Sequence, residues 1–144
     1  MTVDIRTFGR VLGETARSVQ KAHVQLLARE GSDFESWVAY LLLTEQGAAV
    51  PQDAFTNDLA KRLEIEPTTG RRVIDRLVAT GHIRRLTRDN AELIELTPTG
   101  QSHFAYLRES VGQLTRHVIG HLDPQDAATT LKVLHAVSER VENL

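Results

Sequence analysis

The sequence predicts a mainly α-helical fold with a minor β component, in which a small unit of two helices and a hairpin lies between longer helices. Three observations predict it. Near both ends of the chain, apolar residues recur alternately three and four residues apart, the spacing of helices that pack on other helices. In the middle, two short helical segments meet at a turn before Pro67, and two β-rich segments follow. A hydrophobic content of 41% in 144 residues is enough for one domain with a core.

The first two helices are predicted from apolar spacing and from residues that start or stop helices. The first is expected from Asp4 to about Glu30, where Gly31 ends it. Ser32 or Asp33 can cap the second, which is expected over residues 34–46 and is closed by Gly47. A loop over residues 47–54 follows. The seam of the first helix consists of Ile5, Phe8, Leu12, Thr15, Val19, Ala22 and Leu26.

The middle helices are predicted to start at a polar cap and at a proline. A short helix is expected to begin near Thr56 as its N-cap, with Leu59, Ala60 and Leu63 buried. Pro67 suits the first position of the next helix, residues 67–80, because its missing N–H has no helical partner there. Gly70 is predicted on the inner side of this helix, where the preceding helix can approach closely.

A hairpin and two further helices complete the prediction. Residues 82–87 and 92–97 alternate in polarity and are joined by a turn at residues 88–91. A helix over residues 98–122 and a last helix over residues 124–143, capped by Asp123, follow. Helix, turn, helix and hairpin, in that order, make a winged helix-turn-helix, which places its second helix in the major groove of DNA.

The charge distribution favours the same function. From Lys61 to Arg88 there are eight basic residues against three acidic ones, whereas the whole chain carries a net charge of −2. Such a local basic surface on an acidic body is typical of a surface that faces phosphates. The alternative is a solvated helix face.

The ordered motifs of this segment resemble the MarR (multiple antibiotic resistance regulator) family of bacterial transcription regulators. The run LA-x-x-L, a helix ending in L-x-x-x-G, a strand with a closing arginine and a later LT-x-x-G all occur. The resemblance covers essentially the whole chain and implies a dimeric DNA-binding regulator, usually a repressor. The matching positions are Leu59, Ala60, Leu63, Leu77, Gly81, Arg85, Leu96, Thr97 and Gly100.

The wing departs from the family pattern. An arginine usually follows the wing aspartate by two residues, but here Asn90 and Ala91 follow Asp89. Either Arg88 takes over the minor-groove contact or Asn90 enters the groove.

The candidate DNA-binding residues lie on the helix over 67–80 and on the wing over 82–97. Thr68 and Thr69 either bond a phosphate or base edge, or only start the helix. Of the three arginines on that helix, at least one is expected to read a base, since arginine on guanine is the commonest specific contact. Arg76 alternatively pairs with an acid. Arg85 is expected to hold the wing by a salt bridge, and Arg84 is either a DNA contact or solvated. The full set is Thr68, Thr69, Arg71, Arg72, Arg76, Arg84, Arg88 and Asn90.

The apolar seams of the terminal helices predict a homodimer. Residues 1–30 and 101–144 are expected to form a helical dimerisation region, and residues 31–100 the DNA-binding region. Two-fold symmetry would let the protein read a palindromic operator in double-stranded DNA. A purely intramolecular bundle is the alternative.

The family resemblance also implies a small, often aromatic or phenolic, effector between the dimer helices and the DNA-binding lobe. A crevice for it would be lined by Phe34, Trp37, Tyr40 and His23, with Leu26 nearby. Plain core packing is the favoured reading of Trp37 and Tyr40. A winged helix that docks proteins and a DNA-binding protein that ignores ligands remain alternatives.

Other functional classes have little support. His117 and His121 have the spacing of zinc ligands, but no cysteine and no nearby third ligand accompany them, so solvated or interface histidines are favoured over a metal-responsive regulator. No catalytic or nucleotide-binding motif occurs, and neither an enzyme nor a cofactor is expected. The absence of cysteines, of a signal peptide and of an apolar run long enough to span a bilayer predicts a cytoplasmic protein without a membrane partner.

Overall fold

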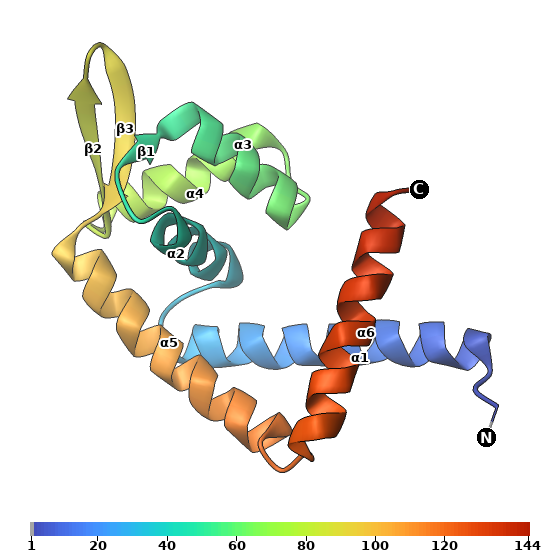
Figure 1. Ribbon diagram of the computed structural model, residues 1–144. Coiled ribbons are helices and arrows are strands. Elements are labelled where there is room, and N and C mark those ends of the chain that lie inside the picture. The colour runs from blue at the N-terminus through green and yellow to red at the C-terminus, as the bar shows by residue number, and fades with distance from the viewer. Residues whose placement is uncertain (1) are drawn as a thin grey trace. The chain divides into compact units, whose positions relative to one another are not determined.

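The computed structural model describes residues 2–144 and shows a mainly helical fold with a small antiparallel sheet (Figure 1). Across these residues there are six helices and one three-stranded sheet. The predicted winged helix-turn-helix fold is confirmed. The elements are α1 (Ile5–Arg29), α2 (Phe34–Gln46), β1 (Val50–Pro51), α3 (Gln52–Leu63), α4 (Pro67–Ala79), β2 (Ile83–Arg88), β3 (Ala91–Leu96), α5 (Pro98–Ile119) and α6 (Pro124–Glu142).

The chain divides into two compact units whose boundary lies within α5. The first extends to Val111 and holds α1 to β3 with the first part of α5; the second is Gly112–Leu144. Within residues 2–144, no helix combines the length and the apolar character needed to cross a bilayer.

The predicted caps at Asp33 and Asp123 are confirmed, and Asp4 caps α1 in the same way. The carboxylates of Asp4, Asp33 and Asp123 accept hydrogen bonds from backbone N–H groups in the first turns of α1, α2 and α6. These N–H groups have no partner inside the helix, so each cap satisfies a donor that would otherwise need water. At the other end of α2, Gly47 has φ 75°, the left-handed geometry that ends a helix.

The sheet contains one strand that the sequence did not reveal. The predicted loop over residues 47–54 includes β1, where Val50 pairs with Ile94 and Pro51 with Leu93. The strand order is therefore β1-β3-β2, with β3 in the centre. A two-residue strand leaves no alternating pattern to detect, and a proline is tolerated there because β1 lies at the sheet edge.

Two predicted helix boundaries were wrong. The third helix begins at Gln52 rather than near Thr56, and Thr56 lies buried inside it with its hydroxyl donating to the Gln52 carbonyl at 2.8 Å. Threonine is a common N-cap residue, but its hydroxyl can also bond a backbone carbonyl inside a helix, as it does here. The residue type alone therefore gave the wrong start. The fifth helix ends at Ile119, not at residue 122.

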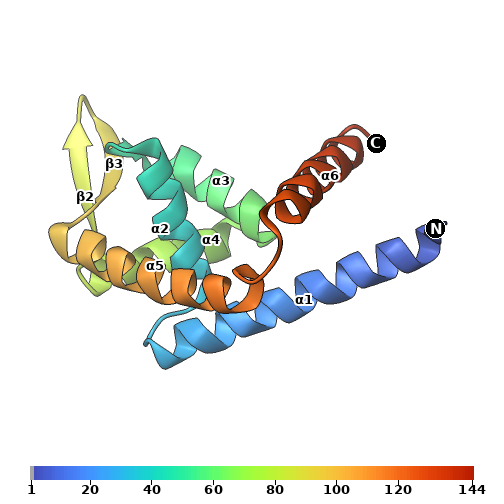
Figure 2. The same cartoon turned by 60° about the horizontal axis from the view of Figure 1, so that its bottom comes forward.

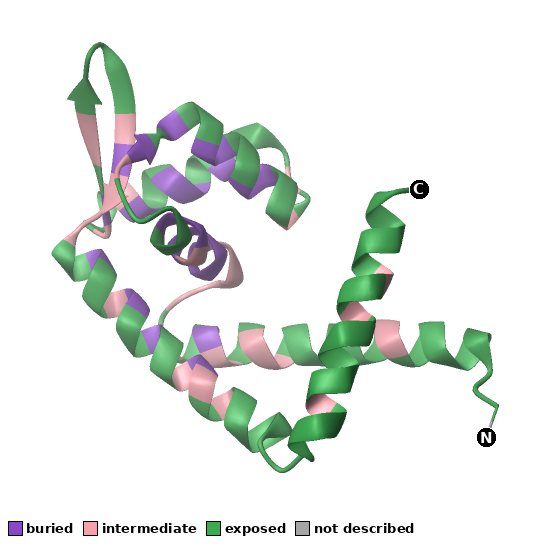
Figure 3. Cartoon of the chain, viewed as in Figure 1, coloured by how far each residue is buried: buried purple, intermediate pink, exposed green. Residues whose placement is uncertain are grey.

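The core is centred on α2, whose middle is buried by α1, α3, α4 and the sheet (Figure 3). Tyr40 is fully buried, and so are Leu59 of α3, Ile74 of α4 and Ile94 of β3. The large buried side chains of α5 are Phe104, Leu107 and Val111, all within the first unit. This core fixes the positions of α4 and of the hairpin.

The first and last helices carry large apolar side chains that are exposed. No residue of α6 is buried, and most of α1 is exposed as well (Figure 3). Large exposed apolar side chains include Ile5, Phe8, Val11 and Val19 on α1, and Leu131, Val133 and Val141 on α6. Exposed apolar side chains that gather in a patch are typical of interaction surfaces.

Candidate nucleic-acid interface

The two helices of the helix-turn-helix pack closely because Gly70 has no side chain. A Cβ at this position would stand 3.3 Å from the Thr56 carbonyl oxygen and 3.6 Å from the Ala60 Cβ. The predicted role of Gly70 is therefore confirmed. Val73, Ile74 and Leu77 bury the inner face of α4, and this leaves its opposite face to solvent.

No side chain caps the start of α4. Pro67 occupies its first turn as predicted, and Glu66 at the N-cap position makes no side-chain cap bond. Thr68 and Thr69 are both exposed. An uncapped helix start presents backbone N–H groups and the positive end of the helix dipole, which suit an anionic phosphate.

Four of the eight basic residues in the basic segment are engaged in ion pairs with acids of the same chain. Arg71 lies 3.6 Å from Asp53 and 3.7 Å from Asp75, distances at which exposed pairs are weak. On the wing, Arg84 Nη2 lies 2.5 Å from Glu95, its cross-strand partner. The paired residues are Arg71, Arg76, Arg84 and Arg85.

Arg76 is held on the N-terminus of α2. Its guanidinium donates to both carboxylate oxygens of Asp33, each at 3.1 Å, and to the Ser36 hydroxyl at 3.3 Å. The same Asp33 carboxylate caps α2. The prediction that Arg76 can pair with an acid is confirmed, and its DNA contact stays a prediction.

Arg85 joins the wing to both helices of the helix-turn-helix. It donates to Asp75 of α4, and its Nε donates to the Gln52 side chain of α3 at 2.7 Å. Gln52 is buried, and its amide nitrogen in turn donates to Glu92 of β3 at 3.1 Å. The predicted salt bridge of Arg85 is confirmed. Gln52 was missed, because a polar residue in an expected loop gives no sign of burial.

The other four cations make no ion pair with any residue in the described part of the chain: Lys61, Arg62, Arg72 and Arg88. Arg72 is exposed on α4, one residue beyond the weakly held Arg71. Lys61 and Arg62 belong to the end of α3, where they line a polar depression with Asp58 and Glu64. Arg72 is thus the unpaired arginine of the predicted recognition helix.

The wing is a tight hairpin that extends from the helices (Figure 2). Arg88 pairs with Ala91, so only Asp89 and Asn90 make the turn. Both have positive φ, 50° and 62°, a conformation that Asp and Asn tolerate better than other side chains. The two-residue turn places Arg88 beside the tip of the wing.

The base of the wing is locked to the start of α5 through the LT-x-x-G motif. The Thr97 hydroxyl donates to the Gly81 carbonyl at 2.6 Å and accepts from the Gly100 N–H at 3.0 Å, as an N-cap does. The Thr97 N–H donates to the His82 carbonyl. A Cβ on Gly100 would stand 2.0 Å from that carbonyl oxygen, so only glycine fits.

The predicted effector residues lie in or near the core. Trp37 is 7% exposed and stacks obliquely on Phe104, with ring centroids 5.3 Å apart, whereas Tyr40 is 0% exposed. Phe34 and His23 are half-buried. Burial raises the pKa of Tyr40 to about 12, with the Asp33 carboxylate adding to the effect. These positions agree with the core reading of Trp37 and Tyr40, and an effector contact stays a prediction.

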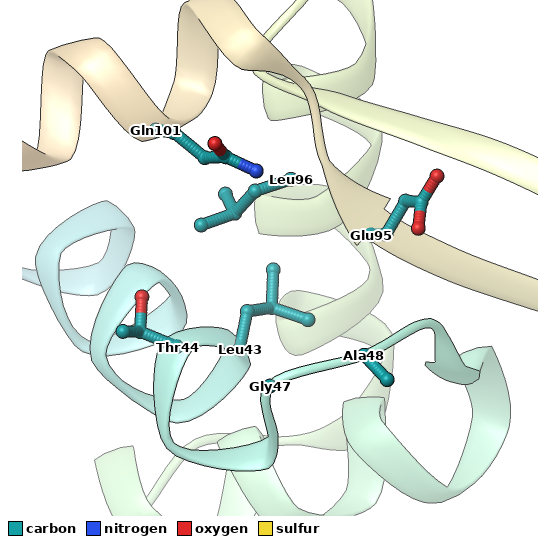
Figure 4. A pocket seen from close by; sticks show the side chains of 7 residues that line it. All are labelled: Leu43, Thr44, Gly47, Ala48, Glu95, Leu96 and Gln101. Atoms are coloured by element: carbon teal, nitrogen blue, oxygen red, sulfur yellow. The ribbon is translucent and has the colours of Figure 1, made fainter.

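A separate small pocket of about 210 Å³ lies between the end of α2, β3 and the start of α5 (Figure 4). Leu43 and Leu96 provide its apolar walls, and Thr44, Glu95 and Gln101 its polar ones. None of the four predicted effector residues lines it.

The two histidines with zinc-ligand spacing do not share a helix. Because α5 ends at Ile119, His117 is helical whereas His121 lies in the following turn. Within residues 2–144, no group of three or more potential ligand side chains is arranged to hold a metal ion.

Solved structures with the same arrangement of elements decide the fold. The transcriptional regulator PA3341 is 25% identical, with a TM-score of 0.78 over 95% of this chain and 99% of that one. Wild-type MarR from E. coli in its apo form is 20% identical, with a TM-score of 0.71 over 95% and 98%. The chain has the fold of the MarR family. CouR from Rhodococcus jostii RHA1, bound to p-coumaroyl-CoA, is 17% identical, with a TM-score of 0.74 over 90% of each chain.

The resemblance to MarR proteins noted in the sequence is thereby confirmed at the level of the fold. PA3341 is described as a transcriptional regulator. A scan against models of protein families finds no match, and a comparison with curated protein sequences finds none either.

Proposed function

We propose that this protein is a dimeric regulator of transcription that binds a palindromic operator through α4 and the wing and acts as a repressor. The observation that carries the proposal is the exposed, unpaired Arg72 on a helix whose open N-terminus bears Thr68 and Thr69. An arginine without an ion pair inside the protein can form a bidentate hydrogen bond to guanine without the free-energy cost of breaking such a pair. Arg71, whose ion pairs are weak, would contact a phosphate.

The wing would add contacts beside the groove that α4 enters. Arg88 lies at the end of β2 next to the turn and has no partner among residues 2–144, so it fits a phosphate or the minor groove. Arg84 can reach DNA only by leaving Glu95. Asn90 is needed for the turn, and a base contact would be additional to that role.

The uncovered apolar side chains of α1 and α6 support a homodimer. Ile5, Phe8 and Val19 belong to the predicted seam of α1, and they are exposed, as are Leu131 and Val141 of α6. A second copy would bury them and would supply a second α4 for the other half of a palindrome.

An effector that releases the DNA is a further part of the proposal. CouR is described with p-coumaroyl-CoA bound, and that ligand contains a phenolic ring. We therefore propose a small aromatic or phenolic effector beside Phe34 and His23, with Trp37 and Tyr40 forming the buried wall.

The test is binding to random-sequence duplex DNA measured by fluorescence anisotropy at several salt concentrations. Each phosphate neutralised contributes a slope of about −0.9 in log affinity against log salt, so a regulator shows a steep loss. Arg108→Ala, which removes an exposed cation of α5, is the control and should leave the slope unchanged. A chain that used the winged helix to dock proteins would show no salt-dependent binding of duplex DNA.

A further inference from the structure

Two histidines meet where the wing base joins α5. His82 stands immediately before β2, and His103 lies in the second turn of α5. Their rings are stacked, with centroids 4.8 Å apart and an angle of 26° between the planes. Both side chains are half-buried. The two rings therefore form a contact between the wing base and α5, in addition to the Thr97 and Gly100 backbone bonds.

Each ring is fixed by a hydroxyl group at its Nδ1 atom. The Tyr40 hydroxyl lies 2.9 Å from Nδ1 of His103, and the Thr80 hydroxyl lies 2.7 Å from Nδ1 of His82. Tyr40 comes from the centre of α2, and its ring also meets His82 and His103 edge-on. The pair is thus anchored in the protein core on one side and in the α4–β2 turn on the other.

The bond to Tyr40 suits a neutral His103. With its pKa raised to about 12, the Tyr40 phenol keeps its proton, which it can donate to an unprotonated Nδ1. When His103 gains a second proton, Nδ1 becomes a donor and the phenol proton must turn away from it. Within residues 2–144, the Tyr40 hydroxyl makes no other hydrogen bond that could receive this proton.

The surroundings also oppose a positive charge on His103. Burial, and then the neighbouring His82, lower the pKa of His103 from its ordinary value of 6.5. The folded state therefore binds the proton less readily than the unfolded chain, and its stability falls as the pH drops below 6.5. Two charged rings in a stack would in addition repel each other.

Two carboxylates of neighbouring segments have partners of their own. Asp33, at the start of α2, is bound to Arg76 of α4. On α5, Tyr106 stands three residues beyond His103, and its hydroxyl donates to Glu30 at 2.5 Å. From α4, the neutral Thr80 faces His82. None of these contacts places a carboxylate on either histidine ring. No described group therefore offers a negative charge to a protonated His103.

We propose that His103 is a positioning residue for the wing, and that its protonation loosens the wing base from α5 and weakens DNA binding. The effect on DNA rests on the function proposed above. Its direction is distinctive, because added positive charge on a protein ordinarily strengthens binding to phosphates as the pH falls. A loss of affinity at low pH therefore requires a structural cause.

The experiment follows histidine ring signals and wing amide signals by NMR from about pH 7.5 to about pH 5.5, the range in which histidines titrate. Duplex affinity is measured by anisotropy over the same range. The amide signals of β2 should shift with the titration of His103, and the affinity should fall several-fold. In His103→Gln, whose side-chain oxygen can still accept from Tyr40, neither the amide shift nor the fall should occur.

Two further variants keep the test decisive. His82→Gln removes the neighbouring ring, so it should raise the pKa of His103 and reduce the fall in affinity. It replaces His103→Gln as the test if that variant does not fold. His135→Gln removes an exposed histidine of α6 and should behave like the unsubstituted protein. An affinity that rises or stays constant at low pH, or a fall that persists in both pair variants, overturns the proposal.

Failure of the proposed function gives a different result. If the protein binds no duplex at any pH, the DNA-binding proposal is wrong. The NMR titration still tests whether protonation of His103 loosens the wing base from α5. Wing amide signals that shift with the titration of His103 would support the loosening of the wing base. Wing amide signals that stay constant through that titration would refute it.

Discussion

Replacing Arg72 by alanine separates DNA reading from folding more cleanly than any other change on α4. The side chain is exposed and makes no ion pair within residues 2–144, so its loss should change the free energy of unfolding by less than about 0.5 kcal/mol. A bidentate arginine on guanine discriminates by about 1–3 kcal/mol. Both copies change in a dimer, so the affinity for the preferred site should fall by at least about 30-fold.

Arg76→Ala is the matched control, because Arg76 lies one turn further along the same helix. The ion pair with Asp33 is half-exposed at both ends and contributes about 0.2–1 kcal/mol to folding. A contact with DNA would first have to break that pair, so the loss of DNA affinity should be smaller than for Arg72→Ala. The stability loss should be the larger of the two.

The assay is a gel-shift or anisotropy titration on the preferred duplex and on a scrambled one, with urea unfolding of each variant. Arg72→Ala should bring the two duplexes to similar affinities while leaving the unfolding midpoint in place. Unchanged preference in Arg72→Ala, or a larger loss of preference in Arg76→Ala, would refute the assignment of base reading to the unpaired arginine.

Three other predictions concern the wing, its base and the response to pH. Arg88→Ala should weaken binding to all duplexes alike and reduce the salt slope by about one unit, and a loss confined to one base position would contradict a phosphate contact. Gly100→Ala forces a Cβ to within 2.0 Å of the His82 carbonyl oxygen and should cost about 1–3 kcal/mol or more. Gly9→Ala in α1, where a Cβ meets nothing within 4 Å, should instead stabilise by up to about 1 kcal/mol, as compared by thermal unfolding. Urea unfolding should show stability falling below pH 6.5, and His103→Gln should reduce that fall, because the buried ring resists protonation in the folded state.

Local chemistry made much of the fold predictable. Helix caps at Asp33 and Asp123 and the close approach at Gly70 depend on near neighbours in the sequence, and each was found where predicted. The strand β1 and the true start of α3 depend on pairing with β3, more than forty residues away. Pairing at that separation leaves no local pattern to read.

The candidate site was less predictable than the fold for the same reason. Charge counting found the eight cations, but it could not show that Asp33 holds Arg76 or that Glu95 holds Arg84. Those pairings join residues brought together only by folding. They turn a uniformly basic segment into four paired and four unpaired cations, and of these only Arg72 lies on the exposed face of α4 without a partner in the described chain.

Selection of bound duplexes from a random pool tests the central claim most directly. A dimer that reads DNA with two copies of α4 should enrich two inverted half-sites whose centres lie about one helical turn of DNA, or a multiple of it, apart. Arg72→Ala should lose the enrichment at one position of each half-site. A pool that stays random, or that converges on a single half-site without a repeat, would contradict the account.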